Sequence, residues 1–222
     1  APRHTAPRRL PPAALEAQGC VVLRRQADGV PGFSPEHGGL GLSAWDEAGT
    51  PLPVHQLLSV LSLIEWENGG GCAVLPPGGP EFLRSLARSR GARLLAPEEE
   101  GWEDLYAALP WFRDGIFAAG RVCARLGRTG ERLSTLAGRV PRFAVLRRDL
   151  PLPDAEALER LSGVLGQPAG SPLRAEEDGG IVRLVPLFRR AALRVAVEAA
   201  DLETAEELWQ IWEKKLRNLT EK

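Results

Sequence analysis

The sequence lacks methionine and has few residues of the kinds that form metal or redox centres. Its 222 residues include only three cysteines and three histidines. Cys20, Cys72 and Cys123 are far apart and form no C-x-x-C pair, so neither a disulfide framework nor a thiolate zinc site is predicted. No histidine stands near a nucleophile and an acidic residue at the spacing of a catalytic triad. The cysteine usage favours a reducing, cytoplasmic setting.

A strong excess of charge and long apolar runs are missing as well. The formal net charge is -1, and the arginines are scattered along the chain instead of gathered on one predicted face. The chain has no run close to the ~18 consecutive apolar residues of a membrane span, and no apolar segment of a signal peptide follows the basic N-terminus. We therefore expect no nucleic-acid partner and no membrane partner.

The first residues, 1–18, are rich in proline and arginine, which is typical of a linker or a remnant. Together with the missing methionine, this composition favours a piece of a longer protein. A chain of this length, with 44% hydrophobic residues, can bury one large core or two modest ones. We expect two domains, at residues 19–139 and 140–222.

Hydrophobic spacing in the first domain predicts helices that alternate with short buried strands. Apolar residues keep helical spacing over 54–66 and 80–90, and each of these segments is followed by a four-residue apolar run, at 72–75 and 92–95. A strand, a helix and a second strand with short connections are typical of a parallel sheet covered by helices. The predicted fold class of this domain is α/β.

The second domain has a different order of predicted helices and strands. A strand at 143–146 and a helix at 154–165 precede a close strand pair at 181–187 and 193–198, and Asp201 caps a last amphipathic helix. This order predicts a small α+β domain with a mainly antiparallel sheet.

Three local motifs occur in a recognisable order. Arg113-Asp114-Gly115 opens a predicted helix, Leu-Ser-Thr-Leu follows at 133–136, and an apolar strand lies at 193–199. In this order they resemble the C-terminal portion of the α-D-phosphohexomutases, the phosphomannomutases and phosphoglucomutases. The resemblance implies that residues 19–139 form the end of the family's second domain plus its third, and that 140–222 form its C-terminal domain. It makes Arg113, Asp114 and Gly115 matched framework residues.

The resemblance also shows what this chain lacks. The family's phosphoryl-carrying serine lies in a domain without a counterpart here. Its metal loop, D-x-D-x-D-R, falls on Ser34, Glu36, Gly38 and Gly39. One carboxylate of three remains, and Mg²⁺ prefers several oxygen ligands in octahedral array. We expect no catalytic residue and no cofactor on this chain, with Mg²⁺ at most in the parent protein. Glu36 and His37 are weak metal candidates, and a plain surface loop is the favoured interpretation.

Two further functional motifs of the family are altered in this sequence. The sugar-reading motif G-E-x-S-G-H would lie between Leu95 and Arg113, and no such string occurs there. The phosphate cradle, of the R-P-S-G-T-E-P type, falls on 185–191. Small residues are replaced there by leucine and phenylalanine, while Arg189 and Arg190 stand at new positions. Both arginines are candidate phosphate ligands. Solvated turn arginines are the commoner alternative.

These patterns support three hypotheses. The first is a catalytically degenerate phosphohexomutase-like module with a structural or sugar-phosphate-sensing role. It resembles the mutase-like tail of bifunctional mannose-1-phosphate guanylyltransferases, which act in nucleotide-sugar biosynthesis. The partner would then be the N-terminal part of its own parent chain or a second copy, and the ligand a hexose phosphate. The second hypothesis is the C-terminal part of a divergent phosphomannomutase or phosphoglucomutase. The third is a protein-interaction domain on an enzyme fold.

Overall fold

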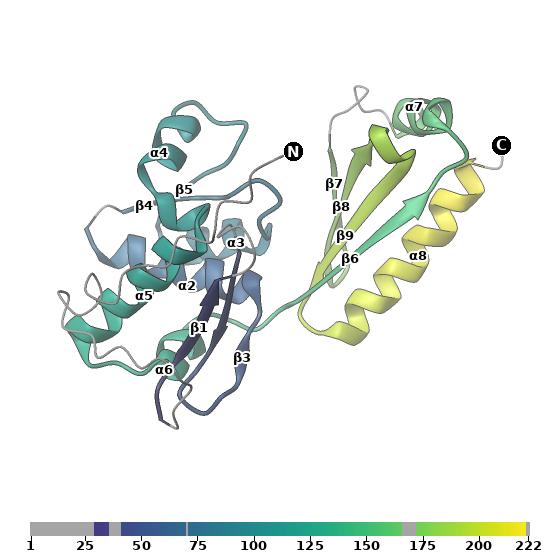
Figure 1. Ribbon diagram of the computed structural model, residues 1–222. Coiled ribbons are helices and arrows are strands. Elements are labelled where there is room, and N and C mark those ends of the chain that lie inside the picture. The colour runs from purple at the N-terminus through teal and green to yellow at the C-terminus, as the bar shows by residue number, and fades with distance from the viewer. Residues whose placement is uncertain (1–28, 36–40, 70, 166–171, 221–222) are drawn as a thin grey trace, which may run out of the picture. The chain divides into compact units, whose positions relative to one another are not determined.

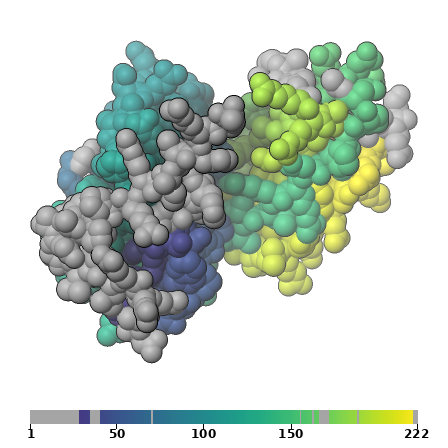
Figure 2. Space-filling model, viewed as in Figure 1, coloured from purple at the N-terminus to yellow at the C-terminus, as the bar shows by residue number. Residues whose placement is uncertain are grey.

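The computed structural model describes residues 29–35, 41–69, 71–165 and 172–220 (Figure 1). The chain divides into two compact units, residues 1–141 and 142–222. Each unit has its own hydrophobic core. Figure 2 shows the surface of both, with the first unit in purple to teal and the second in green to yellow.

The first unit begins with a small antiparallel sheet of three strands in the order β1-β2-β3. The strands are β1 (Gly32–Pro35), β2 (Leu42–Trp45) and β3 (Pro51–Leu52). Asp46 forms the turn between β2 and β3, because its Oδ1 accepts hydrogen bonds from Ala48 N at 2.9 Å and Thr50 N at 2.8 Å. Gly49, with φ of 80°, supplies the left-handed residue that this turn needs.

The next part of the chain forms the predicted pair of parallel strands, joined by a helix. β4 and β5 run parallel, with Ala73 opposite Leu94, and the connecting helix is α3. The bounds are α2 (Val54–Glu67), β4 (Cys72–Val74), α3 (Phe82–Ser89) and β5 (Arg93–Leu95). The preceding helix, α2, is the centre of the core, since Val60, Leu63 and Ile64 are fully buried. The parallel arrangement expected from the sequence is therefore present, in a sheet of two strands.

Three helices and a 3-10 turn complete the first unit: α4 (Trp102–Ala108), η1 (Pro110–Phe112), α5 (Gly115–Thr129) and α6 (Leu133–Gly138). The N-terminus of α6 is held by the Glu47 carboxylate, which accepts hydrogen bonds from Ser134 N at 3.2 Å and from Ser134 Oγ. Burial alone would raise the pKa of Glu47, but the bonds from Ser134 and the charge of Arg132 outweigh it and hold that pKa below its ordinary value.

The second unit is a four-stranded antiparallel sheet in the order β6-β9-β8-β7, covered by α7 and α8 (Figure 1). Its elements are β6 (Ala144–Pro151), α7 (Ala155–Val164), β7 (Leu173–Glu177), β8 (Gly180–Leu187), η2 (Phe188–Arg190), β9 (Ala192–Ala199) and α8 (Leu202–Thr220). Alternate strand residues such as Val195 and Val197 meet Trp209 and Trp212 of α8 in the core. The antiparallel sheet matches the expected α+β pattern.

No helix in the described part of the chain combines the length and the apolar composition required to cross a membrane.

Candidate functional site

The position expected for a metal loop follows β1. Ser34 is exposed near the end of this strand, while Glu36 and His37 lie outside the described residues. The described residues contain no cluster of three or more histidine, cysteine, aspartate or glutamate side chains that could hold a metal. A single carboxylate beside one imidazole does not fit Mg²⁺, which requires several oxygen ligands.

The framework residues Arg113, Asp114 and Gly115 form the N-terminal corner of α5. Asp114 caps the helix, since its Oδ1 accepts hydrogen bonds from Ile116 N at 2.8 Å and Phe117 N at 3.3 Å. Arg113 donates from Nη2 to Ala107 O at 3.1 Å and so ties this corner to α4.

Gly115 brings the start of α5 close to the backbone at the start of β2. A Cβ atom there would lie 2.2 Å from Gly41 O and 3.1 Å from Leu42 Cβ. Only glycine fits such a contact without moving the backbone. All three motif residues thus have an architectural role that the geometry explains.

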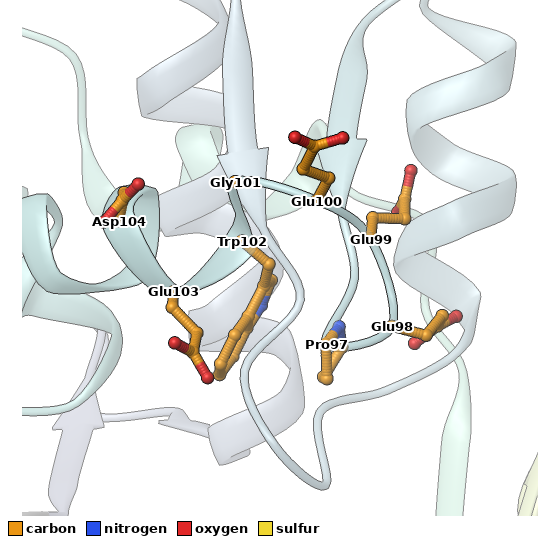
Figure 3. A pocket seen from close by; sticks show the side chains of 8 residues that line it. All are labelled: Pro97, Glu98, Glu99, Glu100, Gly101, Trp102, Glu103 and Asp104. Carbon is orange, nitrogen blue, oxygen red and sulfur yellow. The ribbon is translucent and has the colours of Figure 1, made fainter.

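The carboxyl ends of the parallel strands β4 and β5 are the second location of interest, because open α/β sheets bind ligands at that edge. The loop after β5 and the first turn of α4 form an open pocket of about 340 Å³ there. It is lined by Pro97, Glu98, Glu99, Glu100, Gly101, Trp102, Glu103 and Asp104 (Figure 3). Five carboxylates stand where the resemblance predicts a sugar-reading loop. The pocket is therefore negative, although one of the five, Glu98, is paired with Arg84 of α3, whose Nη2 lies 2.5 Å from Glu98 Oε1.

Hydrogen bonds hold this acidic loop in place. Glu99 accepts a hydrogen bond from Ala96 N at 2.7 Å, which closes the turn after β5. The Trp102 indole donates from Nε1 to Leu75 O at 2.9 Å and stacks on Tyr106 with ring centroids 4.7 Å apart. In Figure 3 the Glu103 side chain lies beside this indole, whereas that of Glu100 points away from it. The carboxylates can accept hydrogen bonds from hydroxyl groups, but they repel a phosphate.

The position expected for a phosphate cradle is the connection between β8 and β9. Pro186 and Leu187 belong to β8 and are paired with β9, and Pro186 has no amide hydrogen to offer an anion. Arg189 and Arg190 lie in η2 and are exposed. The next residue, Ala191, has φ of 43°, a left-handed conformation that costs a non-glycine residue free energy. The side chains that an anion at this turn could meet are the exposed guanidinium groups of Arg189 and Arg190.

An aspartate that the sequence did not single out faces this turn. Asp149 of β6 accepts two hydrogen bonds from Arg194 of β9, at 2.7 Å from Nε and 3.0 Å from Nη2. Arg190 Nη1 lies 4.0 Å from the same carboxylate. The hydrogen bonds from Arg194 hold the pKa of Asp149 below its usual value, and the charge of Arg190 acts in the same direction. Asp149 and Arg194 lie opposite each other in the β6-β9 register, which the sequence alone does not reveal.

Comparison with known proteins gives a consistent result for the fold. No protein-family model matches the sequence, and no match was found among curated proteins. Solved structures do match. A phosphoglucomutase/phosphomannomutase family protein from Burkholderia thailandensis has 15% identity and a TM-score of 0.62 over 93% of this chain and 48% of its own.

Two other solved structures agree. The exocytosis-sensitive phosphoprotein parafusin, a phosphoglucomutase from Paramecium, has 13% identity and a TM-score of 0.56 over 89% of this chain and 47% of its own. An N-acetylglucosamine-phosphate mutase of the α-D-phosphohexomutase superfamily, in its product complex, has 9% identity and a TM-score of 0.54 over 88% of this chain and 49% of its own. The chain spans about half the length of these proteins, and it has a mutase-like α/β fold.

Proposed function

We propose that this chain is a catalytically degenerate phosphohexomutase-like module of a sugar-nucleotide biosynthesis protein, in which it holds the protein together or senses a hexose phosphate. We infer that the parent protein is a mannose-1-phosphate guanylyltransferase and that nucleotidyl transfer takes place on another part of it. One observation supports the proposal above all. The chain has a mutase-like fold, but the positions that bind metal, sugar and phosphate in the phosphohexomutases carry residues that do not suit those ligands.

Two features of the described residues support the loss of mutase chemistry. The edge of β4 and β5 carries an acidic loop with five carboxylates, which disfavours a phosphorylated sugar at close range. The β8-β9 connection keeps its strand pairing through Leu187, and leucine and phenylalanine stand there in place of the small residues of the family's phosphate cradle. Neither feature prevents the fold from serving as a scaffold.

The sensing role depends on Arg189 and Arg190, the two exposed arginines of η2. Isothermal titration of mannose 1-phosphate into the chain should give weak binding. The double change Arg189→Ala and Arg190→Ala should abolish that binding, because both guanidinium groups that reach the turn are removed. Arg160→Ala is the matched control, since Arg160 is an exposed arginine of α7 with a side chain 64% exposed. If the unchanged chain gives no heat of binding, sensing is excluded and only the structural role is left.

The parent activity is tested on the native full-length protein. Incubation with mannose 1-phosphate and GTP should yield GDP-mannose and pyrophosphate, through transfer of GMP to the sugar phosphate. The variant Arg189→Ala/Arg190→Ala should retain this turnover, because these residues have no role in the transfer. A native protein without guanylyltransferase activity would contradict the parent that we infer.

One observation favours a second candidate function. Since the chain spans about half of the solved phosphohexomutases, the remaining half of a parent protein could carry the reactive serine. The full-length protein would then interconvert hexose 1-phosphates and 6-phosphates in the presence of Mg²⁺. In that case Glu36→Ala should reduce the rate, whereas an unchanged rate would remove Glu36 from the mechanism. A parent with neither activity would leave the protein-interaction hypothesis.

A further inference from the structure

The sheet of the second unit packs both of its helices against the same face, where they form one core with it. Arg148 of β6 points to that face, since its Nη2 lies 2.6 Å from Glu206 Oε1 of α8 and its guanidinium lies over the ring of Trp209. Successive residues of a strand point to opposite faces, so the neighbouring Arg147 points to the other side of the sheet. We call this other side the open face.

Arginines lie in one row across the open face. Arg147 of β6 is opposite Ala196 of β9, and Ala196 is opposite Arg183 of β8. Arg183 is in turn opposite Arg174 of β7. Neighbouring strands are about 4.8 Å apart, so Arg147 and Arg183 flank the small side chain of Ala196 with their backbones about 10 Å apart. We call Arg147, Arg183 and Arg174 the arginine row; Arg147 and Arg174 are exposed, and Arg183 is half-buried.

The arginine row concentrates positive charge. Like charges directly opposite each other destabilise a strand pair, and Arg174 faces Arg183 in this way. The pKa of Arg147 lies below its ordinary value, first because of desolvation and then because of the charge of Arg183. Two acidic side chains offset part of this charge: Glu176 Oε1 lies 2.8 Å from Arg174 Nη2, and the buried Glu198 acts on Arg147. A further anion over the row would relieve the repulsion that is left.

The acidic loop of the first unit, residues 98–104, has the opposite charge. Two of its five carboxylates, those of Glu98 and Glu99, are engaged within the unit. The other three belong to Glu100, Glu103 and Asp104 (Figure 3). These three residues are exposed, and within the described part of the chain they form no ion pair. The loop and the arginine row are therefore complementary in charge.

We propose that the acidic loop of one copy of this chain docks on the arginine row of a second copy. Ala196 leaves room for a carboxylate between Arg147 and Arg183, where it can accept hydrogen bonds from both guanidinium groups. The net charge of -1 is too small for two copies to repel each other strongly. Because the two surfaces differ, the contact is head-to-tail, and every copy offers both.

The contact rests on the structural role proposed above and gives that role a surface. Its test uses neither sugar phosphate nor nucleotide, so its failure leaves the tests of sensing and of guanylyl transfer unaffected. The method is sedimentation equilibrium of the full chain at two salt concentrations. At about 0.01 M salt, where charges act over about 30 Å, the average mass should exceed the 24.0 kDa of one chain. At about 1 M salt, where that range is about 3 Å, the mass should fall to one chain. A single chain at both concentrations, or a larger mass that salt does not change, would overturn the proposal.

Charge reversal identifies the two surfaces. Glu100→Lys/Glu103→Lys and Arg147→Glu/Arg174→Glu should each be monomeric at low salt, because each variant brings like charges together. An equal mixture of the two should associate again. In the mixture the unchanged loop of the second variant meets the unchanged row of the first, and the two reversed surfaces also attract each other. Restored association shows in addition that both variants fold.

A matched control separates this contact from the effect of net charge. Glu156→Lys/Glu159→Lys changes two exposed glutamates of α7 and alters the net charge as much as the loop variant does, so it should associate like the unchanged chain. A mixture of the two reversed variants that stays monomeric would refute the pairing of these surfaces. A monomeric chain that binds a polyglutamate peptide would overturn the second copy as the occupant of the arginine row and assign that row to another acidic protein.

Discussion

Replacing Gly115 by alanine tests whether the Arg113-Asp114-Gly115 motif is architectural. The added Cβ would lie 2.2 Å from Gly41 O and 2.7 Å from Gly41 C, and both of these are backbone atoms that cannot rotate away. Overpacking of this kind costs about 1–3 kcal/mol. The better helix propensity of alanine offsets at most about 1 kcal/mol of that cost. We expect a net loss of about 2 kcal/mol in the stability of the first unit.

Hydrogen exchange measured by mass spectrometry can assign this loss to one unit. Protected amides of β4 should exchange about 30-fold faster in Gly115→Ala, which corresponds to about 2 kcal/mol, while those of β9 should not change. Gly138→Ala is the matched control, because a Cβ at Gly138 meets nothing within 4 Å and alanine favours the helix. Gly138→Ala should slow exchange slightly. Equal or slower exchange in Gly115→Ala would refute the close approach between α5 and Gly41.

Two further changes probe the turns of each unit. Glu47→Gln should cost about 1 kcal/mol at pH 7, as the loss of a helix cap does. Because the pKa of Glu47 is lowered on folding, its contribution to stability is present above the ordinary carboxyl pKa and fades as the pH falls through the folded value. The urea midpoints of the two proteins should therefore converge in acid, and a gap independent of pH would contradict this role. Ala191→Gly should raise the free energy of unfolding by on the order of 1 kcal/mol, because glycine adopts the φ of 43° without a Cβ clash. A lower melting temperature would argue against that backbone conformation.

Elements with strong apolar periodicity could be predicted from the sequence, and those held by their neighbours could not. Helix α2 and strands β4 and β5 were predicted because their apolar residues are buried in the core. Strand β7 was missed, since Leu-Arg-Ala-Glu-Glu is largely charged and owes its conformation to pairing with β8 at the edge of the sheet. The two-residue strand β3 starts at a proline and gives no periodic signal.

Those features of the candidate site that depend on the type of a single residue could be predicted from the sequence, and those that depend on tertiary contacts could not. The cap at Asp114 could be predicted from the residue type at the start of an amphipathic segment. The pairing of Asp149 with Arg194 could not, because it depends on the register of two strands that are far apart in the sequence. A run of three glutamates, as at 98–100, is typical of the first turn of a helix, where negative charge suits the helix dipole. The structure instead places it in a loop before α4, where hydrogen bonding by Glu99 fixes the turn.

The pairing of β6 with β9 also constrains how the second unit is made. The first strand of this unit aligns with the last along its full length, from Ala144 opposite Ala199 to Pro151 opposite Ala192. During synthesis, β6 therefore leaves the ribosome long before its partner exists, and its backbone groups wait unpaired until β9 emerges. Contacts between distant parts of a chain form slowly. In a polypeptide that stops after β8, both β6 and β8 would lack the partner strand between them, and such open strand edges recruit other chains into aggregates.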